Sequence, residues 1–333
     1  MRYRYISELA GRNPDERSGN NIFSIPVEET LCSGGAATVN VLALGDVGST
    51  VLLGLMLAGR EVIDTIGIYD IDEKNIRRFE REMNQIRFPD GRKMPEVRGI
   101  DESRLFDCDV MVFCASKGVP AIGEKGDVRM AQLEANRGLV SHFGKMALER
   151  AYKGLFAVVS DPVDQLCMAA MKAGLRPEQV QGYGLGVMNG RAAYYASKDD
   201  RFSSYLTEGR AFGPHGSDLV IANSITDYDD TLSRELTGLA VNANMEMRND
   251  GFKPYIAPAI SSGAIAITET IGGGWNYSSV FIGNEKEGGF LGCRNRRSGG
   301  LAGECIEIEE LPLHEKLFER IKSAYDNLKE ELV

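Results

Sequence analysis

The chain has 333 residues, of which 43% are hydrophobic and 26% charged, and its formal net charge at pH 7 is −10. This composition is typical of a globular protein of about two domains. The acidic balance argues against a nucleic-acid partner, because phosphates need basic clusters. No run of about 18 apolar residues is present, so we expect no membrane span. The N-terminus lacks the apolar core of a secretory leader, so we predict a cytoplasmic protein.

Six cysteines are spread along the chain, and no two of them form a Cys-x-x-Cys pair. They are Cys32, Cys108, Cys114, Cys167, Cys293 and Cys305. Their isolation within apolar or strand-like segments predicts reduced, buried thiols. We therefore predict no metal site built on cysteine.

The first 35 residues are polar and irregular, and we interpret 1–35 as an N-terminal extension. One interpretation is an arm that packs on a partner subunit. The other is a disordered segment. The sequence pattern favours neither.

Between residues 36 and 180, apolar runs alternate with helical stretches. The runs that suit strands covered on both faces are 38–44, 65–69, 110–113 and 155–159. The helical stretches include 49–58 and 128–151. This alternation predicts an α/β fold with a Rossmann-type, doubly wound parallel sheet over 36–180.

Beyond residue 180 the pattern changes. Glycines become frequent, short strand-like segments such as 280–282 appear, and 313–332 has the pattern of a charged C-terminal helix. We predict a mixed α+β substrate domain over 181–333.

The turn after the first predicted strand reads Ala43-Leu44-Gly45-Asp46-Val47-Gly48 and is followed by a helix. This is the dinucleotide fingerprint with its first glycine replaced by alanine, and the helix N-terminus offers N–H groups to a pyrophosphate. Asp70 ends the next strand, where an acid accepts hydrogen bonds from ribose hydroxyls and repels a 2′-phosphate. The alternative is a tight turn without a ligand. We predict NAD, with these cofactor-binding residues: Gly45, Asp46, Val47, Gly48, Asp70 and Ala115.

His215 is one of three histidines and lies between glycines in Gly213-Pro214-His215-Gly216. Imidazole titrates near neutral pH, so His215 is a candidate proton shuttle. A purely structural histidine is the alternative.

Several motifs together resemble the lactate/malate dehydrogenase family, in order and spacing, from about residue 38 to the C-terminus. They are Gly126-Asp127-Val128-Arg129 followed by Asn136, Ser160-Asp161-Pro162-Val163-Asp164, the segment from Gly182 to Arg191, His215-Gly216, Ala259 to Ile265, and Phe290 to Cys293. The resemblance implies reversible hydride transfer between nicotinamide and a 2-hydroxy/2-oxo acid. It also implies a homodimer or homotetramer.

The resemblance assigns roles to particular residues. His215 would be the proton shuttle, Arg129 would polarise the substrate carbonyl from a loop, and Arg191 would clamp the substrate carboxylate in a two-pronged fork. Asn136 and Ser261 would also bind substrate. The predicted catalytic residues are thus His215, Asp161 and Arg129, and the predicted substrate-binding residues are Arg191, Asn136 and Ser261.

Two departures from the family pattern bear on this chemistry. Met188 stands where the family has the aspartate that orients the histidine, and Asp161 stands where it has an asparagine. Our hypothesis is that Asp161 pairs with His215 or recognises a cationic or hydroxyl group of the substrate. Two alternatives stay open: a dehydrogenase for an amino- or polyhydroxy-bearing substrate, and a non-catalytic nucleotide-binding protein. Neither lactate nor malate is indicated as the substrate.

Overall fold

The computed structural model describes residues 3–12, 21–32, 34–117, 128–216, 218–284 and 286–331, without the side chains of 128–132 and 331. Among these residues, 11 strands form one sheet and a separate hairpin stands beside it. None of the described helices is both long and apolar enough to cross a membrane.

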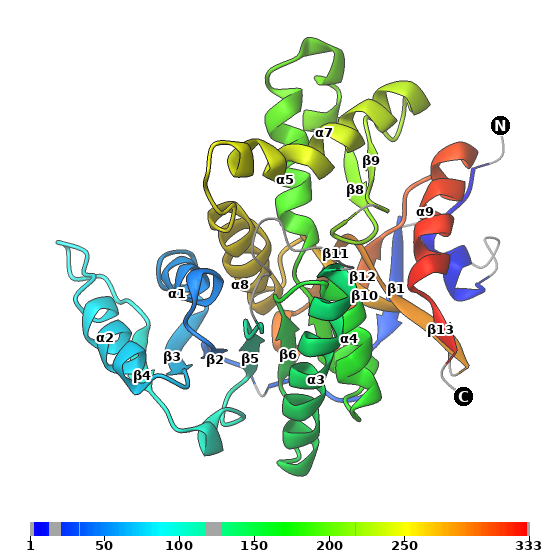
Figure 1. Cartoon of the computed structure of the whole chain (residues 1–333). Coiled ribbons are helices and arrows are strands. Elements are labelled where there is room, and N and C mark those ends of the chain that lie inside the picture. The colour runs from blue at the N-terminus through cyan, green and yellow to red at the C-terminus, as the bar shows by residue number, and fades with distance from the viewer. Residues whose placement is uncertain are drawn as a thin grey trace.

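Six parallel strands build the first half of the sheet, in the spatial order β4-β3-β2-β5-β6-β7 (Figure 1). They are β2 (Ala37–Leu42), β3 (Ile63–Tyr69), β4 (Glu96–Gly99), β5 (Val110–Phe113), β6 (Leu155–Val158) and β7 (Val180–Gly182). The chain runs outward from β2 through β3 to β4 and then returns to place β5 on the other side of β2. This reversal makes the carboxyl ends of β2 and β5 the expected ligand crevice. The predicted doubly wound parallel sheet is confirmed.

Helices cover both faces of this half. They are α1 (Asp46–Ala58), α2 (Glu73–Met83), α3 (Val128–Glu149) and α4 (Val163–Lys172). Val110 and Val112 of β5 lie in the core beneath α1 and α2, whereas Met111 and Phe113 lie in the core beneath α3 and α4. Because both faces are buried, β5 and β6 are continuous apolar runs, which is why the sequence revealed them.

Antiparallel strands extend the same sheet. They are β10 (Asn276–Gly283), β11 (Glu287–Ser298), β12 (Cys305–Glu309) and the short β13 (Glu330–Glu331). Ser279 of β10 lies opposite Gly182 of β7, so the sheet passes without a break from one half of the chain to the other. The predicted boundary at residue 180 falls inside β7.

The described parts of the N-terminal extension pack against this chain's own sheet. The 3₁₀-helix η1 (Ile6–Ala10) is followed by β1 (Ile22–Pro26), which pairs antiparallel with β12. Phe23 is buried with Ile306 and Ile308. Over residues 3–12 and 21–32, the interpretation as a disordered segment was therefore wrong, whereas contact with a partner subunit stays a prediction. Burial of Phe23 and pairing with β12 supply the order.

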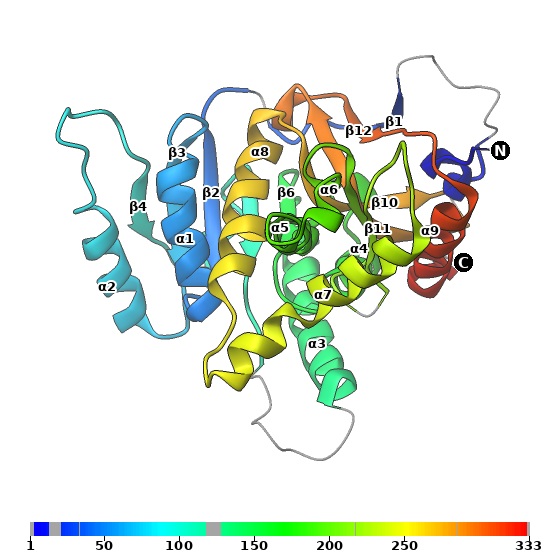
Figure 2. The same cartoon turned by 90° about the horizontal axis from the view of Figure 1, so that it is seen from above.

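The second half of the chain adds further helices (Figure 2). They are α5 (Leu185–Ala196), α6 (Tyr205–Glu208), α7 (Asp230–Asn249), the π-helical η6 (Pro258–Ile265), α8 (Ala266–Gly272) and α9 (Glu315–Leu328). Short 3₁₀ turns complete the elements: η3 (Glu102–Arg104), η4 (Pro177–Gln179), η5 (Asp200–Phe202) and η7 (Gly300–Ala302). A Cβ on Gly54 would lie 2.4 Å from that of Ala264, so α1 and η6 pack in close contact.

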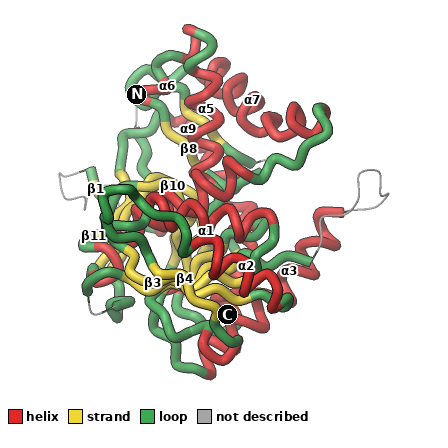
Figure 3. Tube along the Cα trace, turned by 90° about the vertical axis from the view of Figure 1, so that its left-hand side faces the viewer, coloured by secondary structure: helices red, strands yellow, loops and turns green. Residues whose placement is uncertain are grey.

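The hairpin of β8 (Arg210–Phe212) and β9 (Val220–Ala222) forms a separate two-stranded sheet, near α5 and α9 (Figure 3). Its connecting loop carries His215. This arrangement confirms the predicted α+β character of the second half.

Candidate active site

The Gly turn between β2 and α1 has an open, uncapped helix N-terminus. Gly45 precedes the helix without a side-chain cap, and a Cβ at Gly45 would meet no atom within 4 Å. At Gly48, by contrast, a Cβ would lie 1.8 Å from the carbonyl oxygen of Ala43. Ala43 itself has a φ of +73°, the left-handed conformation that the replaced glycine would adopt freely. The turn therefore keeps the geometry of the fingerprint despite the alanine.

Asp70 ties the end of β3 to this turn. Its Oδ2 accepts a hydrogen bond from the N–H of Leu44 at 2.6 Å, and its Oδ1 accepts one from the N–H of Asp72 at 2.9 Å. Ala115 follows β5, and its carbonyl accepts a bond from the Ser160 hydroxyl at 2.8 Å. Asp70 thus lies beside the Gly turn, as the fingerprint requires.

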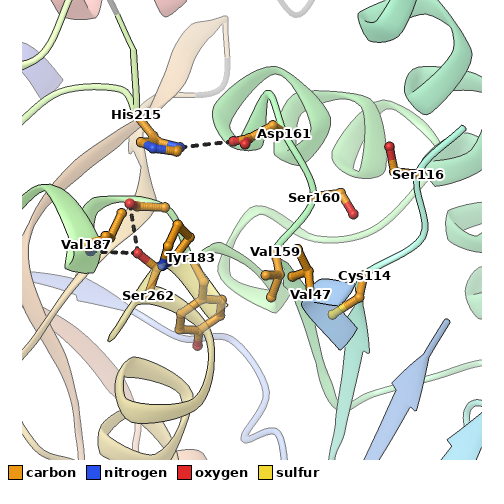
Figure 4. A pocket seen from close by; sticks show the side chains of 12 residues that line it. Val47, Cys114, Ser116, Val159, Ser160, Asp161, Tyr183, Val187, His215 and Ser262 are labelled. Atoms are coloured by element: carbon orange, nitrogen blue, oxygen red, sulfur yellow. Dashed lines mark hydrogen bonds and ion pairs between the residues drawn. The ribbon is translucent and has the colours of Figure 1, made fainter. Parts of the chain in front are cut away.

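A cavity of about 160 Å³ opens next to the turn (Figure 4). It is lined by Val47, Cys114, Ser116, Val159, Ser160, Asp161, Tyr183, Gly184, Val187, His215, Pro258 and Ser262. The cavity connects the first turn of α1 with the ends of β5 and β6 and with the β8–β9 loop. Of the predicted site residues, it brings together Val47, Asp161 and His215.

Asp161 and His215 face each other across one wall of this cavity (Figure 4). His215 Nδ1 lies 3.0 Å from Asp161 Oδ1. Because an ionised carboxylate can only accept a hydrogen bond, Nδ1 carries the proton and Nε2 of the neutral ring is left as an acceptor. Gly184 makes room for the ring, since a Cβ there would lie 2.9 Å from that of His215.

This contact changes the pKa of both groups. Burial disfavours the imidazolium, but the charge and hydrogen bond of Asp161 outweigh burial and raise the pKa of His215 above 6.5. Desolvation likewise opposes ionisation of Asp161, yet His215 and, more weakly, Arg191 lower the pKa of its carboxyl below 3.8. The pair therefore stabilises the imidazolium that forms when the ring takes up a proton.

Arg191 is a half-buried guanidinium on α5, one turn after the buried Met188. Its Nη1 lies 3.5 Å from Met188 Sδ and 3.4 Å from the carbonyl oxygen of Ala240. Within the described part of the chain, no carboxylate lies within 4 Å of it. Desolvation lowers its pKa, which the negative charge of Asp161 partly offsets. A half-buried cation that has no carboxylate in contact among the described residues is suited to binding an anionic ligand.

Residues 37–182 match the family model described as lactate/malate dehydrogenase, NAD binding domain. This part of the chain is thus similar to the NAD-binding domain of lactate and malate dehydrogenases. An L-lactate dehydrogenase of Treponema denticola is 28% identical over 200 residues, which are 56% of this chain and 58% of that protein. One of Corynebacterium glutamicum is 26% identical over 202 residues, 59% of this chain and 61% of that protein. These matches span less than two thirds of each relative's length.

Solved dehydrogenases share the fold over most of the chain. A lactate dehydrogenase from a deep-sea metagenome library of the Medee basin has a TM-score of 0.72 at 19% identity, over 88% of this chain and 96% of that one. A malate dehydrogenase of Archaeoglobus fulgidus in complex with NADH has a TM-score of 0.68 at 20% identity, over 87% and 97%. The Rossmann fold of the NAD-binding domain is thus shared.

The Gly turn fits NAD. The open space at Gly45 and the uncapped N–H groups of α1 suit a pyrophosphate, and Asp70 suits a ribose. Ala115 does not line the cavity, whereas its neighbours Cys114 and Ser116 do. The side chains that face the cavity thus belong to the flanking residues, and cofactor binding by Ala115 stays a prediction.

Two of the predicted substrate-binding residues, Asn136 and Ser261, are not among the residues that line the cavity. Asn136 is fully buried, accepts from the N–H of Lys117 at 3.0 Å and donates to the carbonyl of Asp161 at 2.8 Å. Its amide thus supports the main chain of Asp161, and its contact with substrate stays a prediction. Ser261 does not line the cavity. The buried hydroxyl of Ser262 lines it instead, accepting from Val187 N–H at 2.7 Å and donating to the Gly184 carbonyl at 2.8 Å.

Arg129 belongs to the first turn of α3, where the resemblance placed it on a loop. Its side chain lies outside the described residues. The loop before it, residues 118–127, also lies outside them.

Asp164 was not among the predicted site residues, and its side chain is buried, at 2% exposed, in the first turn of α4. One of its oxygens, Oδ1, has no hydrogen-bond partner among the described residues. Burial raises the pKa of this carboxyl to about 6, although a bond with Ser279 and the charge of His215 oppose the shift. Asp164 was visible in the motif that contains Asp161, but the sequence does not show which of two nearby aspartates is buried.

Proposed function

We propose that this chain is an NAD-dependent oxidoreductase that interconverts a 2-hydroxy acid and a 2-oxo acid. The observation that carries the proposal is the 3.0 Å contact between His215 Nδ1 and Asp161 Oδ1, in a cavity next to the cofactor turn. A proton shuttle with a carboxylate partner beside a nicotinamide cofactor is what this reaction needs.

NAD, when bound, accepts or supplies the hydride. In the oxidation direction, His215 Nε2 takes the proton of the substrate hydroxyl, while Nδ1–H remains bonded to Asp161. The carboxylate stabilises the imidazolium that forms, a role that Met188 cannot fill because a thioether is a weak acceptor. In the reverse direction, His215 returns the proton from Nε2 to the oxygen.

Arg191 binds the carboxylate of the acid. Its planar fork makes two parallel hydrogen bonds, which fixes the orientation of the reacting carbon relative to His215. Arg129 keeps the role that the resemblance gives it, polarisation of the carbonyl. Asp70 accepts hydrogen bonds from the ribose hydroxyls of NAD.

The test is calorimetric titration of NADH into the protein, alone and then with each member of a panel of 2-oxo acids. We expect micromolar binding of NADH that one acid strengthens, because cofactor and substrate form a ternary complex. In Arg191→Lys, NADH should still bind, but the acid should no longer strengthen its binding. Absence of NADH binding to the unchanged protein would contradict the proposal, and NADH binding without help from any acid would favour the non-catalytic alternative.

A second candidate substrate class follows from Asp161. Its side chain is 57% exposed in the pocket wall, and a carboxylate there attracts an amine or hydroxyl group. The panel should therefore include 2-oxo acids with an amino group and with further hydroxyls. Preference for one of these would indicate that Asp161 also contacts the substrate. Assembly as a homodimer or homotetramer is part of the same proposal and is tested by sedimentation.

A further inference from the structure

One ion pair joins the cofactor turn to a distant part of the chain. Lys253 lies in the segment between α7 and η6, and its Nζ is 3.1 Å from Oδ2 of Asp46, the first residue of α1. The two residues are 207 positions apart in the sequence. Both side chains are largely exposed, at 82% for Lys253 and 53% for Asp46. An ion pair this exposed contributes little to stability, so stability does not explain it.

Asp46 presents an electrostatic difficulty at this place. A carboxylate in the first turn of a helix interacts well with the helix dipole. However, the pyrophosphate of NAD approaches the same N-terminus in a Rossmann fold, and a carboxylate beside it repels the two phosphate charges. The site therefore needs a cation near Asp46. Among the described residues, Lys253 is the only one that forms an ion pair with Asp46.

We propose that Lys253 is a cofactor-binding residue of this chain. In the free protein its ammonium neutralises Asp46. When NAD binds, the same ammonium interacts with the pyrophosphate and screens it from the Asp46 carboxylate. A lysine suits this exchange because its ammonium is a compact charge on a flexible stem, without the fixed geometry of an arginine fork.

The inference rests on the cofactor part of the proposed function and not on the substrate chemistry. It assigns a role to the segment between α7 and η6, which brings Lys253 to Asp46 at the start of α1. Neither family motif nor cavity lining includes this segment.

The test is a fluorescence titration of NADH with four proteins: the unchanged chain, Lys253→Gln, Asp46→Asn and the double variant. We expect Lys253→Gln to weaken NADH binding by about tenfold, the effect of losing one charge-assisted contact and exposing one repulsive charge. Asp46→Asn should strengthen it, because repulsion is removed. Lys145→Gln on the exposed face of α3 is the matched control and should bind like the unchanged chain.

The double variant separates the two roles of Lys253. If Lys253 binds the pyrophosphate, Lys253→Gln weakens binding in the Asp46→Asn background as well. If it has no effect there, Lys253 only neutralises Asp46 and the proposed cofactor contact is overturned.

Adenosine provides a further arm because it lacks phosphate. Its affinity, measured by competition with NADH, should be the same for the unchanged chain and for the Lys253→Gln variant; an equal loss for both ligands would overturn the proposal. If the unchanged chain binds no NADH, the proposed function itself fails, whereas binding that Lys253→Gln leaves unaltered removes only this inference.

Discussion

Ala43 and Gly48 approach each other closely across the cofactor turn: a Cβ on Gly48 would lie 1.8 Å from the carbonyl oxygen of Ala43. Ala43 reaches this arrangement with a φ of +73°. For an L-residue other than glycine, the left-handed region is unfavourable by roughly 1–2 kcal/mol. Both positions favour glycine, but only one of them has it.

Ala43→Gly should therefore stabilise the protein. Glycine removes the conformational cost of an alanine in the left-handed region, and this gain outweighs the extra backbone entropy that glycine brings to the unfolded chain. We expect the free energy of unfolding to rise by about 1 kcal/mol. The measurement is urea unfolding, read as a shift of the midpoint at constant slope. A lower midpoint would mean that the turn tolerates alanine without strain.

Gly48→Ala is predicted to have the opposite effect. The contact with the Ala43 carbonyl is with main chain, which cannot move aside as a flexible side chain does, so the turn must open. We expect loss of at least about 2 kcal/mol of stability, on the scale of overpacked sites, and much weaker NADH binding. Gly45→Ala is the matched comparison for stability, since a Cβ there meets nothing within 4 Å. Equal stability of the two variants would contradict the close approach.

Asp161→Asn should lower the pKa of His215. The carboxylate is what raises the pKa above 6.5, since burial alone acts in the other direction. A histidine with a raised pKa in the folded state stabilises the protein fully below about pH 6.5, and this contribution is lost as pH rises through the raised pKa. Because Asp161 is more than half exposed, solvent screening keeps the contribution below about 1 kcal/mol.

The measurement for this variant is NMR titration of the His215 ring, with His142 and His314 as internal references. The resonance of His215 should titrate at lower pH in the variant, and the stability difference between the two proteins should vanish at alkaline pH. Turnover should be lost under the proposed mechanism. An unchanged rate would remove Asp161 from it, whatever the titration shows.

Much of this fold was predictable because buried parallel strands leave a strong signal. β5 and β6 are apolar at every position, so composition alone reveals them. β1 left no such signal, since it is short, ends in Pro26 and is ordered by pairing with β12, which is remote in sequence. Local pattern cannot report a partner that lies so far along the chain.

The candidate site, like the fold, was predictable only in part. Loss of the orienting aspartate at Met188 pointed to Asp161, and the contact of Asp161 with His215 lies across 54 residues. Spacing could not show that the Asn136 amide turns toward main chain. Nor could it choose between the adjacent hydroxyls of Ser261 and Ser262, because the π-helical turn changes which side faces the cavity.

Asp164→Asn should stabilise the protein at neutral pH. The carboxyl has an ordinary pKa of 3.8, and burial raises it to about 6 in the folded state. A folded state that holds a proton more tightly than the unfolded state loses stability as pH rises between these two values, and the loss is complete above about pH 6. An asparagine has no charge to desolvate. We therefore expect the variant to be more stable by about 2 kcal/mol at about pH 7–8 and by little near pH 4.

The measurement is urea unfolding of both proteins from about pH 4 to about pH 8, with Asp101→Asn as the control. Asp101 is exposed and makes no side-chain capping bond, so its variant should follow the unchanged protein across the whole range. Because the charge of Asp164 contributes to the raised pKa of His215, replacing Asp164 should also lower the pKa of that ring slightly. A stability gain at every pH, including the acid end of the range, would point to better packing of the amide and away from a buried charge as the cause.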